Sequence, residues 1–481
     1  MSFESVIGLE IHTQLQTASK LFCGCSTRFG APPNANTCPV CLGLPGSLPV
    51  LNRRAVDLGV KAALALGCTV HPTSIFARKN YFYPDLPKGY QISQYDRPLA
   101  TEGALEFETR GGPRRVGIIR VHLEEDAGKS LHEGLPDSDR MTAIDFNRSG
   151  VPLIEIVSHP DVRSAADAGE FFSRMRAILV ATEVTDGNME EGSLRCDANI
   201  SVRRAGEPLG VKAEIKNLNS FRHVQRALEY EIARQISVLE AGGAVEHETR
   251  LWDPAAGRTL SMRSKEDAHD YRYFPEPDLP PLRIAASAID ELRRTLPELP
   301  DARRRRLVAQ YALPDYDAAL LTQSTAVAAY FEATAASSGN AKAASNWIMG
   351  DVTRKMNELG GGIDDVPLSP ESLAGLIRLV DSGTISGPTA KDVFEKMYAS
   401  GRSAAAIVEA EGLGRIDDEA SVAAAVHQVM AANGEAVKQY RAGKKQTYGF
   451  LVGQVIKSMG GKANPALVNA LVRRELDKDP A

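Results

Sequence analysis

The stretch Ile118-Ile-Arg-Val-His-Leu-Glu-Glu125 decides how the first half of this 481-residue chain folds. One set of alternate positions in it is apolar: Ile119, Val121 and Leu123. The other set is polar: Arg120, His122 and Glu124. Successive side chains of a β-strand point to opposite faces, so this period of two predicts a strand with one buried and one polar face.

Three further segments alternate in the same way: Val6–His12, Arg195–Val202 and Val211–Lys216. Their apolar positions are Ile7, Leu9 and Ile11; Cys196, Ala198, Ile200 and Val202; and Val211, Ala213 and Ile215. Their polar positions are Glu10 and His12; Arg195, Asp197, Asn199 and Ser201; and Lys212, Glu214 and Lys216. Taken one by one, these segments are typical of an antiparallel sheet with one solvent face.

Taken together, the polar positions favour a binding surface over a plain solvent face. Histidine, paired carboxylates and asparagine recur in them, and these suit Mg²⁺ or Mn²⁺, whereas lysine and arginine suit phosphate oxygens. The run Glu124-Glu-Asp126 places three acids in a row, which repel one another unless a cation or water offsets their charge. The sheet is therefore predicted to form a cradle for ATP and Mg²⁺.

The common phosphate-binding loops are missing from the sequence. Gly128-Lys-Ser130 looks like the end of a Walker A motif, but Leu123 stands where that motif needs its first glycine. No Gly-x-Gly-x-x-Gly follows a predicted strand and opens a helix, which excludes a dinucleotide-binding fold of that type. If ATP is used, side chains and metal ions on the sheet must hold its phosphates.

Four of the six cysteines form two close pairs, Cys23-x-Cys25 and Cys38-x2-Cys41. Such pairs, joined by a loop, can bring four thiolates to the corners of a tetrahedron, and Zn²⁺ accepts four sulfurs in this way. Ordinary thiols that bind no metal are the alternative. Because four sulfurs leave no open position, we expect a structural zinc knuckle at about 23–41.

Composition indicates a cytoplasmic protein with several domains. The chain is 43% hydrophobic and 24% charged, with a formal net charge of −5, and its N-terminus lacks the pattern of a secretory signal. No apolar run reaches the roughly 18 residues that a membrane helix needs. Segments up to about 285 are β-rich, and a proline-rich stretch at 274–282 precedes an alanine-rich helical part. We expect domains at 1–285, 286–401 and 402–481, the last two helical.

The last segment is basic, although the chain as a whole is acidic. From 436 to 478 there are nine basic residues and two acids. This asymmetry is typical of a surface that binds a polyanion, and a solvated helical face is the alternative. The candidate contacts are Lys444, Lys445, Arg473 and Arg474.

Several longer motifs resemble the GatB family, the B subunits of the tRNA-dependent amidotransferases. They are Val6-Ile-Gly-Leu-Glu-Ile-His-Thr-Gln-Leu15, the cysteine cluster, Lys79-Asn-Tyr-Phe-Tyr-Pro-Asp85, His122-Leu-Glu-Glu-Asp-Ala-Gly-Lys129, Asp145-Phe-Asn-Arg-Ser-Gly-Val-Pro-Leu-Ile-Glu-Ile-Val-Ser158 and Lys444-Lys-Gln-Thr-Tyr-Gly-Phe-Leu-Val-Gly453. The resemblance covers essentially the whole chain. It implies an α+β fold: an antiparallel-sheet cradle resembling glutamine synthetase with an inserted zinc knuckle, then all-helical middle and tail domains.

The resemblance also implies a reaction and its partners. Such a protein phosphorylates the side-chain carboxylate of Glu-tRNA(Gln) or Asp-tRNA(Asn) with ATP and Mg²⁺, and ammonia from the amidase, the A subunit, displaces the phosphate. The small C subunit braces the pair, and no membrane is involved. The catalytic residues expected are Glu10, His12, Glu124, Glu125 and Glu214, of which His12, Glu125 and Glu214 are expected to bind magnesium. The cofactor contacts expected are Lys79, Arg195, Lys216, Asp197 and Asn199.

Two other functions compete with that of a ligase subunit. A non-catalytic scaffold that only presents tRNA would not need the polar positions of the sheet. A free-standing enzyme resembling glutamine synthetase would act on a free amino acid and would have no use for a basic tail.

Overall fold

The computed structural model describes residues 3–109, 111–131, 140–264, 271–415, 418–460 and 462–478. The chain divides into two compact units, Met1–Ala302 and Arg303–Ala481. The first holds the sheets and one hydrophobic core, and the second is helical with two separate cores. The mixed α+β class with a sheet-rich N-terminal part is therefore confirmed.

The largest sheet within the described residues has nine strands, in the order β14-β13-β12-β11-β1-β10-β7-β6-β2. Their bounds are β1 (Phe3–Gln14), β2 (Thr69–Val70), β6 (Ala100–Thr109), β7 (Gly112–Glu125), β10 (Pro152–Ser158), β11 (Leu194–Arg204), β12 (Ala213–Lys216), β13 (Glu248–Asp253) and β14 (Arg258–Ser264). Seven of the eight pairings are antiparallel, and β12 runs parallel to β13. The expected antiparallel cradle thus contains one parallel pairing.

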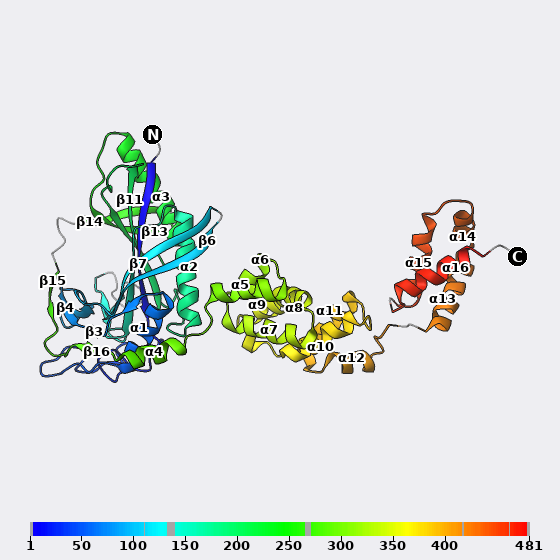
Figure 1. The fold of residues 1–481 in the computed structure, drawn as a ribbon, viewed down its shortest axis with the longest axis horizontal. Helices are drawn as coiled ribbons and strands as arrows, with labels where there is room; N and C mark the ends of the chain where they lie inside the picture. The colour runs from blue at the N-terminus through cyan, green and yellow to red at the C-terminus, as the bar shows by residue number, and fades with distance from the viewer. Residues whose placement is uncertain are drawn as a thin grey trace. The chain divides into compact units, whose positions relative to one another are not determined.

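Three helices pack on one face of this sheet: α1 (Arg53–Ala65), α2 (Ala165–Ala181) and α3 (Phe221–Glu240) (Figure 1). Ile7, Leu9 and Ile11 of β1 are at most 1% exposed and belong to the same core as Phe171 and Phe172 of α2. This burial explains why the apolar positions of the alternating segments recur. The other face is left for the polar side chains.

Two of the predicted apolar positions were wrong. Ile119 is 38% exposed because a β-bulge interrupts the pairing of β7 with β10, so that Val157 faces Arg120 and Ser158 faces Ile118. The bulge turns Ile119 out of the core, and Ile118 is fully buried instead. Val211 is 49% exposed because it precedes β12, which begins at Ala213.

A smaller three-stranded sheet lies next to the polar face. It is made of β15 (Arg272–Pro275), β4 (Phe76–Asn80) and β5 (Tyr90–Gln94), in that order. Strand β5 contacts β7, and the Ser93 hydroxyl on β5 donates a hydrogen bond to Glu124 on β7. The two-stranded sheets pair β16 (Leu282–Arg283) with β3 (Thr73–Ser74), and β8 (Lys129–Leu131) with β9 (Ala143–Asp145).

Helix α4 (Ala286–Arg294) packs on α1, so the first unit continues past 285 to Ala302. Helix α5 (Pro300–Tyr311) begins in the last residues of the first unit and continues into the second. The second unit then contains α6 (Asp315–Leu321), α7 (Thr325–Ser338), α8 (Ala341–Trp347), a π-helical turn (Ile348–Val352), α9 (Thr353–Leu359), a 3₁₀ turn (Ile363–Asp365), α10 (Pro370–Asp381), α11 (Gly387–Ser400), α12 (Ala404–Ala410), α13 (Glu419–Ala432), α14 (Gly434–Arg441), α15 (Thr447–Ser458) and α16 (Pro465–Leu476).

Side-chain caps set several of these helix starts. The Ser324 hydroxyl accepts from the Val327 N–H at the start of α7, and the Asn464 side chain accepts from the Ala466 N–H at the start of α16. Pro465 occupies the first turn of α16, where a missing N–H costs nothing. None of the helices in the described ranges is long and apolar enough to span a bilayer.

Candidate active site and metal centre

The four clustered cysteines lie close enough to share one ion. Sγ atoms of Cys23, Cys25, Cys38 and Cys41 all lie within 4.8 Å of one another. A tetrahedral zinc with Zn–S bonds of about 2.3 Å has S–S edges of about 3.8 Å, which is compatible with sulfurs that all lie within 4.8 Å of one another. Cys68 and Cys196 are buried outside this group.

A buried lysine offsets the negative charge of this sulfur cluster. Lys20 is fully buried, and its Nζ lies 3.6 Å from Cys41 Sγ while donating to the carbonyls of Asn36 and Phe146. The Cys38 N–H also points at Cys41 Sγ, 3.2 Å away. A hydrogen bond from the Cys23 thiol and the charge of Lys20 lower the pKa of Cys41 to about 4, although burial opposes this. Anionic sulfur beside a buried cation fits a zinc–thiolate centre.

Replacing Cys38 by serine should release zinc and lower the Tm of the full chain by roughly 5–10 °C, because bound metal contributes folding free energy. Elemental analysis and calorimetry measure both effects. Cys68→Ser is the matched control, since Cys68 is buried outside the cluster, and it should retain one zinc per chain. Native protein without zinc would contradict this assignment.

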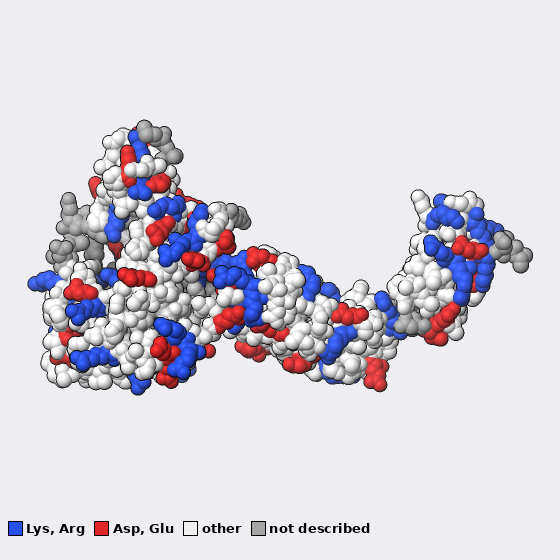
Figure 2. Space-filling model, in the orientation of Figure 1, with Lys and Arg blue, Asp and Glu red and all other residues white. Residues whose placement is uncertain are grey.

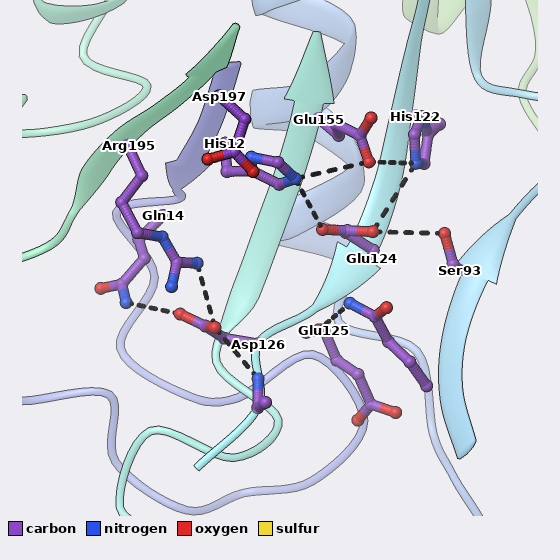
Figure 3. Close-up of polar contacts among 12 residues, drawn as sticks. His12, Gln14, Ser93, His122, Glu124, Glu125, Asp126, Glu155, Arg195 and Asp197 are labelled. Atoms are coloured by element: carbon purple, nitrogen blue, oxygen red, sulfur yellow. Dashed lines mark hydrogen bonds and ion pairs between the residues drawn. The ribbon is translucent and has the colours of Figure 1, made fainter. Parts of the chain in front are cut away.

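The polar positions of neighbouring strands meet on the free face of the nine-stranded sheet. His12 on β1 pairs in register with Glu155 on β10, and Glu155 pairs with His122 on β7. His12 Nε2 lies 3.5 Å from Glu155 and 3.9 Å from Glu124, and His122 Nε2 lies 3.3 Å and 3.6 Å from the same two carboxylates. Figure 3 shows these four side chains turned toward one another.

Three members of this cluster form a mixed nitrogen and oxygen donor set. One ligand atom each of His12, Glu124 and Glu155 lies within 4.8 Å of the other two. Among the described side chains, His122 Nδ1 is one of the few buried polar atoms without a hydrogen-bond partner. One imidazole and two carboxylates, with room on the cavity side for water or phosphate, fit a hard divalent cation such as Mg²⁺ or Mn²⁺.

The histidines and carboxylates of the cluster strongly shift one another's pKa values. Burial by itself would lower the pKa of His12, but its hydrogen bond to Glu155 and the charges of Glu155 and Glu124 raise it to about 9. Burial by itself would raise the pKa of Glu155, yet the two histidines hold it well below its usual value. The two neighbouring imidazoles thus offset the negative charge of Glu155.

Cationic side chains line the cavity of about 450 Å³ above this cluster. Lys79 comes from β4, Arg195 from β11 and Lys216 from β12. Lys216 Nζ lies 2.8 Å from both Asp197 and Glu214, and Arg195 lies 3.0 Å from Asp126. The cavity thus combines a metal-ligand set with three cations, which is the arrangement that phosphoryl transfer requires.

The structure separates Glu125 from the other expected ligands. Its carboxylate accepts from Lys88 Nζ and from the Ile92 N–H, and Figure 3 shows it turned away from His12. It lines a different cavity, of about 130 Å³, together with Cys23 and Cys41. Adjacent residues of a strand point to opposite faces, so Glu124 and Glu125 could not both face His12. The magnesium ligands expected from the sequence are His12, Glu125 and Glu214, whereas the donor atoms that lie together are those of His12, Glu124 and Glu155.

Glu10, Asn199 and Glu214 lie on the same polar face, toward the other end of the strands. Asn199 Nδ2 donates to Glu10 at 2.8 Å, and Thr249 donates to Glu214 at 3.0 Å. Burial, together with the charges of Glu155 and Glu214, raises the pKa of Glu10. These groups lie beside the ligand cluster but outside it.

Sequence reasoning missed Glu155 and gave no role to His122 or Asp126. Glu155 is the one charged residue in Pro152–Ser158, a strand that lies in the middle of the sheet. A single carboxylate in an otherwise buried strand was the signal that could have identified it. Asp126 is held by Arg195, by Arg148 at 3.7 Å and by Gln14 at 3.0 Å, which keeps its pKa low despite burial.

Comparison with known proteins finds similarity over nearly the whole chain. The family described as "GatB/GatE catalytic domain" matches residues 5–290, and "GatB domain" matches residues 329–476. The chain belongs to the GatB family. A protein of Moorella thermoacetica is 56% identical over 477 residues, and one of Trichlorobacter lovleyi is 54% identical over 477 residues; each alignment covers 99% of this chain and 100% of the relative. Each relative is named as the B subunit of an aspartyl/glutamyl-tRNA(Asn/Gln) amidotransferase.

The two GatB family matches cover different parts of the chain: the first covers the sheet-rich part and the second covers helices. The catalytic-domain match contains the cysteine cluster and the residues that line the cradle cavity. The second match contains the candidate tail contacts Lys444, Lys445, Arg473 and Arg474.

The tail of this GatB family member presents basic side chains on its last helices (Figure 2). Lys445 lies 4.0 Å from the centre of the Tyr440 ring, and Arg473 lies 5.9 Å from that of Tyr448. Among the described residues, no acid forms an ion pair with Lys444, Lys445 or Arg473, whereas Arg474 pairs with Glu419 at 3.0 Å. The first three therefore offer more uncompensated charge than Arg474 does.

Metal binding to the GatB cradle should strengthen as pH rises. A cation can use His12 only after its proton leaves, and neighbouring carboxylates raise the pKa of His12 to about 9. We expect the affinity for Mn²⁺ to rise about tenfold per pH unit between about pH 7 and 9, measured by titration of the full chain. An affinity that is independent of pH over this range would show that His12 is not a ligand.

Proposed function

We propose that this chain is the part of a tRNA-dependent amidotransferase that activates the misacylated amino acid. The substrates are Glu-tRNA(Gln), Asp-tRNA(Asn) or both, and the products are Gln-tRNA(Gln) and Asn-tRNA(Asn). The observation that carries this proposal is the buried cluster of His12, Glu124 and Glu155, faced by Lys79, Arg195 and Lys216 in one cavity.

The chemistry explains why both kinds of group are needed. A carboxylate is a poor acyl donor, so the side chain of the misacylated residue must first attack the γ-phosphorus of ATP, releasing ADP and forming an acyl phosphate. This brings two anions together, and a divalent cation bound at His12, Glu124 and Glu155 would offset their repulsion. Lys79, Arg195 and Lys216 hold phosphate oxygens from the other walls of the cavity.

Ammonia then attacks the acyl carbon and inorganic phosphate leaves. The attacking nitrogen must lose a proton, and a carboxylate of the cradle such as Glu10 or Glu214 can take it, because burial and neighbouring charges raise the pKa of Glu10. The ammonia comes from glutamine hydrolysed by the amidase partner, with a small third protein, the C subunit, holding the pair together. The zinc knuckle needs reduced cysteines, which supports a cytoplasmic location.

A scaffold that only presents tRNA is less well supported. Placing His12 beside the buried His122, Glu124 and Glu155 costs free energy, and a protein that only presents tRNA gives no reason for that cost. A free-standing ligase acting on a free amino acid would leave the basic tail without a ligand.

Reconstitution tests the proposed function. The chain is combined with its amidase and small partner proteins, ATP, glutamine and Glu-tRNA(Gln), and the esterified amino acid is released and identified. We expect Gln-tRNA(Gln), and no conversion when this chain or ATP is left out. Conversion that proceeds without this chain would refute the proposal.

A further inference from the structure

The three cations that line the cavity above the ligand cluster are held in different ways. Lys216 Nζ lies 2.8 Å from each of two carboxylates, and Arg195 pairs with Asp126 at 3.0 Å. Lys79 forms no ion pair with any carboxylate in the part of the chain that the structure describes. Direct contact with an acid therefore neutralises the first two cations but leaves the charge of Lys79 uncompensated.

Aromatic rings take the place of a carboxylate beside Lys79. Its Nζ lies 4.6 Å from the centre of the Tyr271 ring and 5.8 Å from that of the Tyr81 ring. The two rings pack edge to face, with their centres 5.6 Å apart. The negative face of an aromatic ring attracts a cation, so these rings can hold the ammonium without neutralising it.

Strand alternation explains why these side chains gather on one side of the small sheet. Tyr273 on β15 and Gln91 on β5 pair in register with Lys79 on β4. Tyr271 lies two residues before Tyr273, and Tyr81 lies two residues after the lysine. Residues two apart share a face of a strand, so the rings lie on the side of the ammonium. Gln91 and Lys79 both line the cavity, which shows that this face is turned toward the ligand cluster.

The two rings stand differently toward the cavity. Tyr81 lines it, whereas Tyr271 is not among the lining residues and is 46% exposed. Burial by itself would lower the pKa of Lys79, but nearby negative charge, that of Glu124 foremost, raises it. Lys79 therefore keeps its proton, and Tyr271 can act on a bound ligand only through this ammonium.

We propose that Tyr271 is a positioning residue for phosphoryl transfer: its ring holds the Lys79 ammonium at the cavity wall and leaves it free to bind a phosphate oxygen. A carboxylate in the same place would hold the lysine as well, but it would offset the positive charge and repel phosphate. The proposal rests on the proposed function, in which Lys79 binds phosphate oxygens.

Five variants of the full chain test this role. Tyr271→Leu removes the ring, whereas Tyr271→Phe keeps the ring and removes only the hydroxyl. Lys79→Met removes the ammonium, and it is also combined with Tyr271→Leu. Phe274→Leu is the matched control: Phe274 is also 46% exposed, and its ring centre lies 5.9 Å from the guanidinium of Arg78, a cation that does not line the cavity.

Equilibrium dialysis gives the Kd of each variant for Mg·ATP, and titration gives its Kd for Mn²⁺. We expect Tyr271→Leu to weaken Mg·ATP binding roughly three- to tenfold, and Tyr271→Phe and Phe274→Leu to stay within about twofold of wild type. Adding Tyr271→Leu to Lys79→Met should cause no further loss, because the ring then has no ammonium to hold. Tyr271→Leu should leave Mn²⁺ binding unchanged, because the ligand cluster is intact.

Wild-type affinity for Mg·ATP in Tyr271→Leu would overturn the proposal. An equal loss in Tyr271→Phe would also overturn it, since the hydroxyl and not the ring would then be responsible. A tyrosine that only supports the fold would cause the same loss with and without Lys79 and would weaken Mn²⁺ binding as well. Failure of the proposed function shows in the wild-type chain, which would then bind no Mg·ATP, and that result would overturn both proposals together.

Discussion

Replacing His12 by alanine, or Glu155 by glutamine, should lower the rate of ATP-dependent activation of charged tRNA by roughly a hundred- to a thousandfold. Either change removes one of three donors that lie within 4.8 Å of one another, so the cation that offsets phosphate charge is lost or misplaced. The measurement is ADP release that depends on charged tRNA, in the reconstituted complex. Glutamine hydrolysis by the amidase partner should survive at least in part, because that chemistry uses none of these side chains.

Glu124 and Glu125 give this prediction a matched pair of variants. They are adjacent glutamates and similarly buried, at 3% and 2% exposure, but only Glu124 faces His12. Glu124→Gln should abolish Mn²⁺ binding to the full chain, and Glu125→Gln should retain it. Loss of Mn²⁺ in the Glu125 variant with retention in the Glu124 variant would reverse the assignment of ligands.

Reversing two charges in the tail should strongly weaken the binding of charged tRNA. Lys444→Glu combined with Lys445→Glu should weaken binding of charged tRNA at least tenfold and reduce the slope of log affinity against log salt by roughly 1 for each phosphate that the tail no longer touches. These lysines form no ion pair with a described acid, so their charge is free to meet phosphates. A-form RNA hides its base edges in a deep groove, which makes phosphate contacts the natural way for such a tail to bind.

Binding measured over a salt series tests the tail. Lys391→Glu with Lys396→Glu on α11 makes the same change in net charge outside the tail helices and should leave affinity and slope nearly unchanged. Mg·ATP binding should be unchanged in both double variants. A tail variant with wild-type affinity and slope would remove these lysines from the tRNA interface.

Much of the fold follows from local patterns in the sequence. The alternation in Val6–His12 and Arg195–Val202 predicted strands that the structure contains, and the apolar positions there are buried. The helix from Pro465 to Leu476 follows from its Asn464 cap and first-turn proline. In each of these segments, the residues that set the element are neighbours along the chain.

The features that escaped prediction depend on pairing between distant segments. The bulge that exposes Ile119 arises where β7 pairs with β10, and no residue within Ile118–Glu125 signals it. Likewise, Glu155 lies beside His12 and Glu124 only because β10 lies between β1 and β7. Glu125 was grouped with Glu124 and Asp126 as one run of acids, although strand alternation turns Glu124 and Glu125 to different sides and Glu125 pairs with Lys88.

The central claim is that this chain transfers the γ-phosphoryl group of ATP to the amino acid carried by tRNA. A rapid-quench, single-turnover reaction with γ-³²P-labelled ATP, charged tRNA and no ammonia donor tests it most directly. We predict that label appears on Glu-tRNA(Gln), that hydroxylamine converts this species to a hydroxamate, and that His12→Ala abolishes it. Amide formation by the complete enzyme with no phosphorylated aminoacyl-tRNA at any time point would contradict the account.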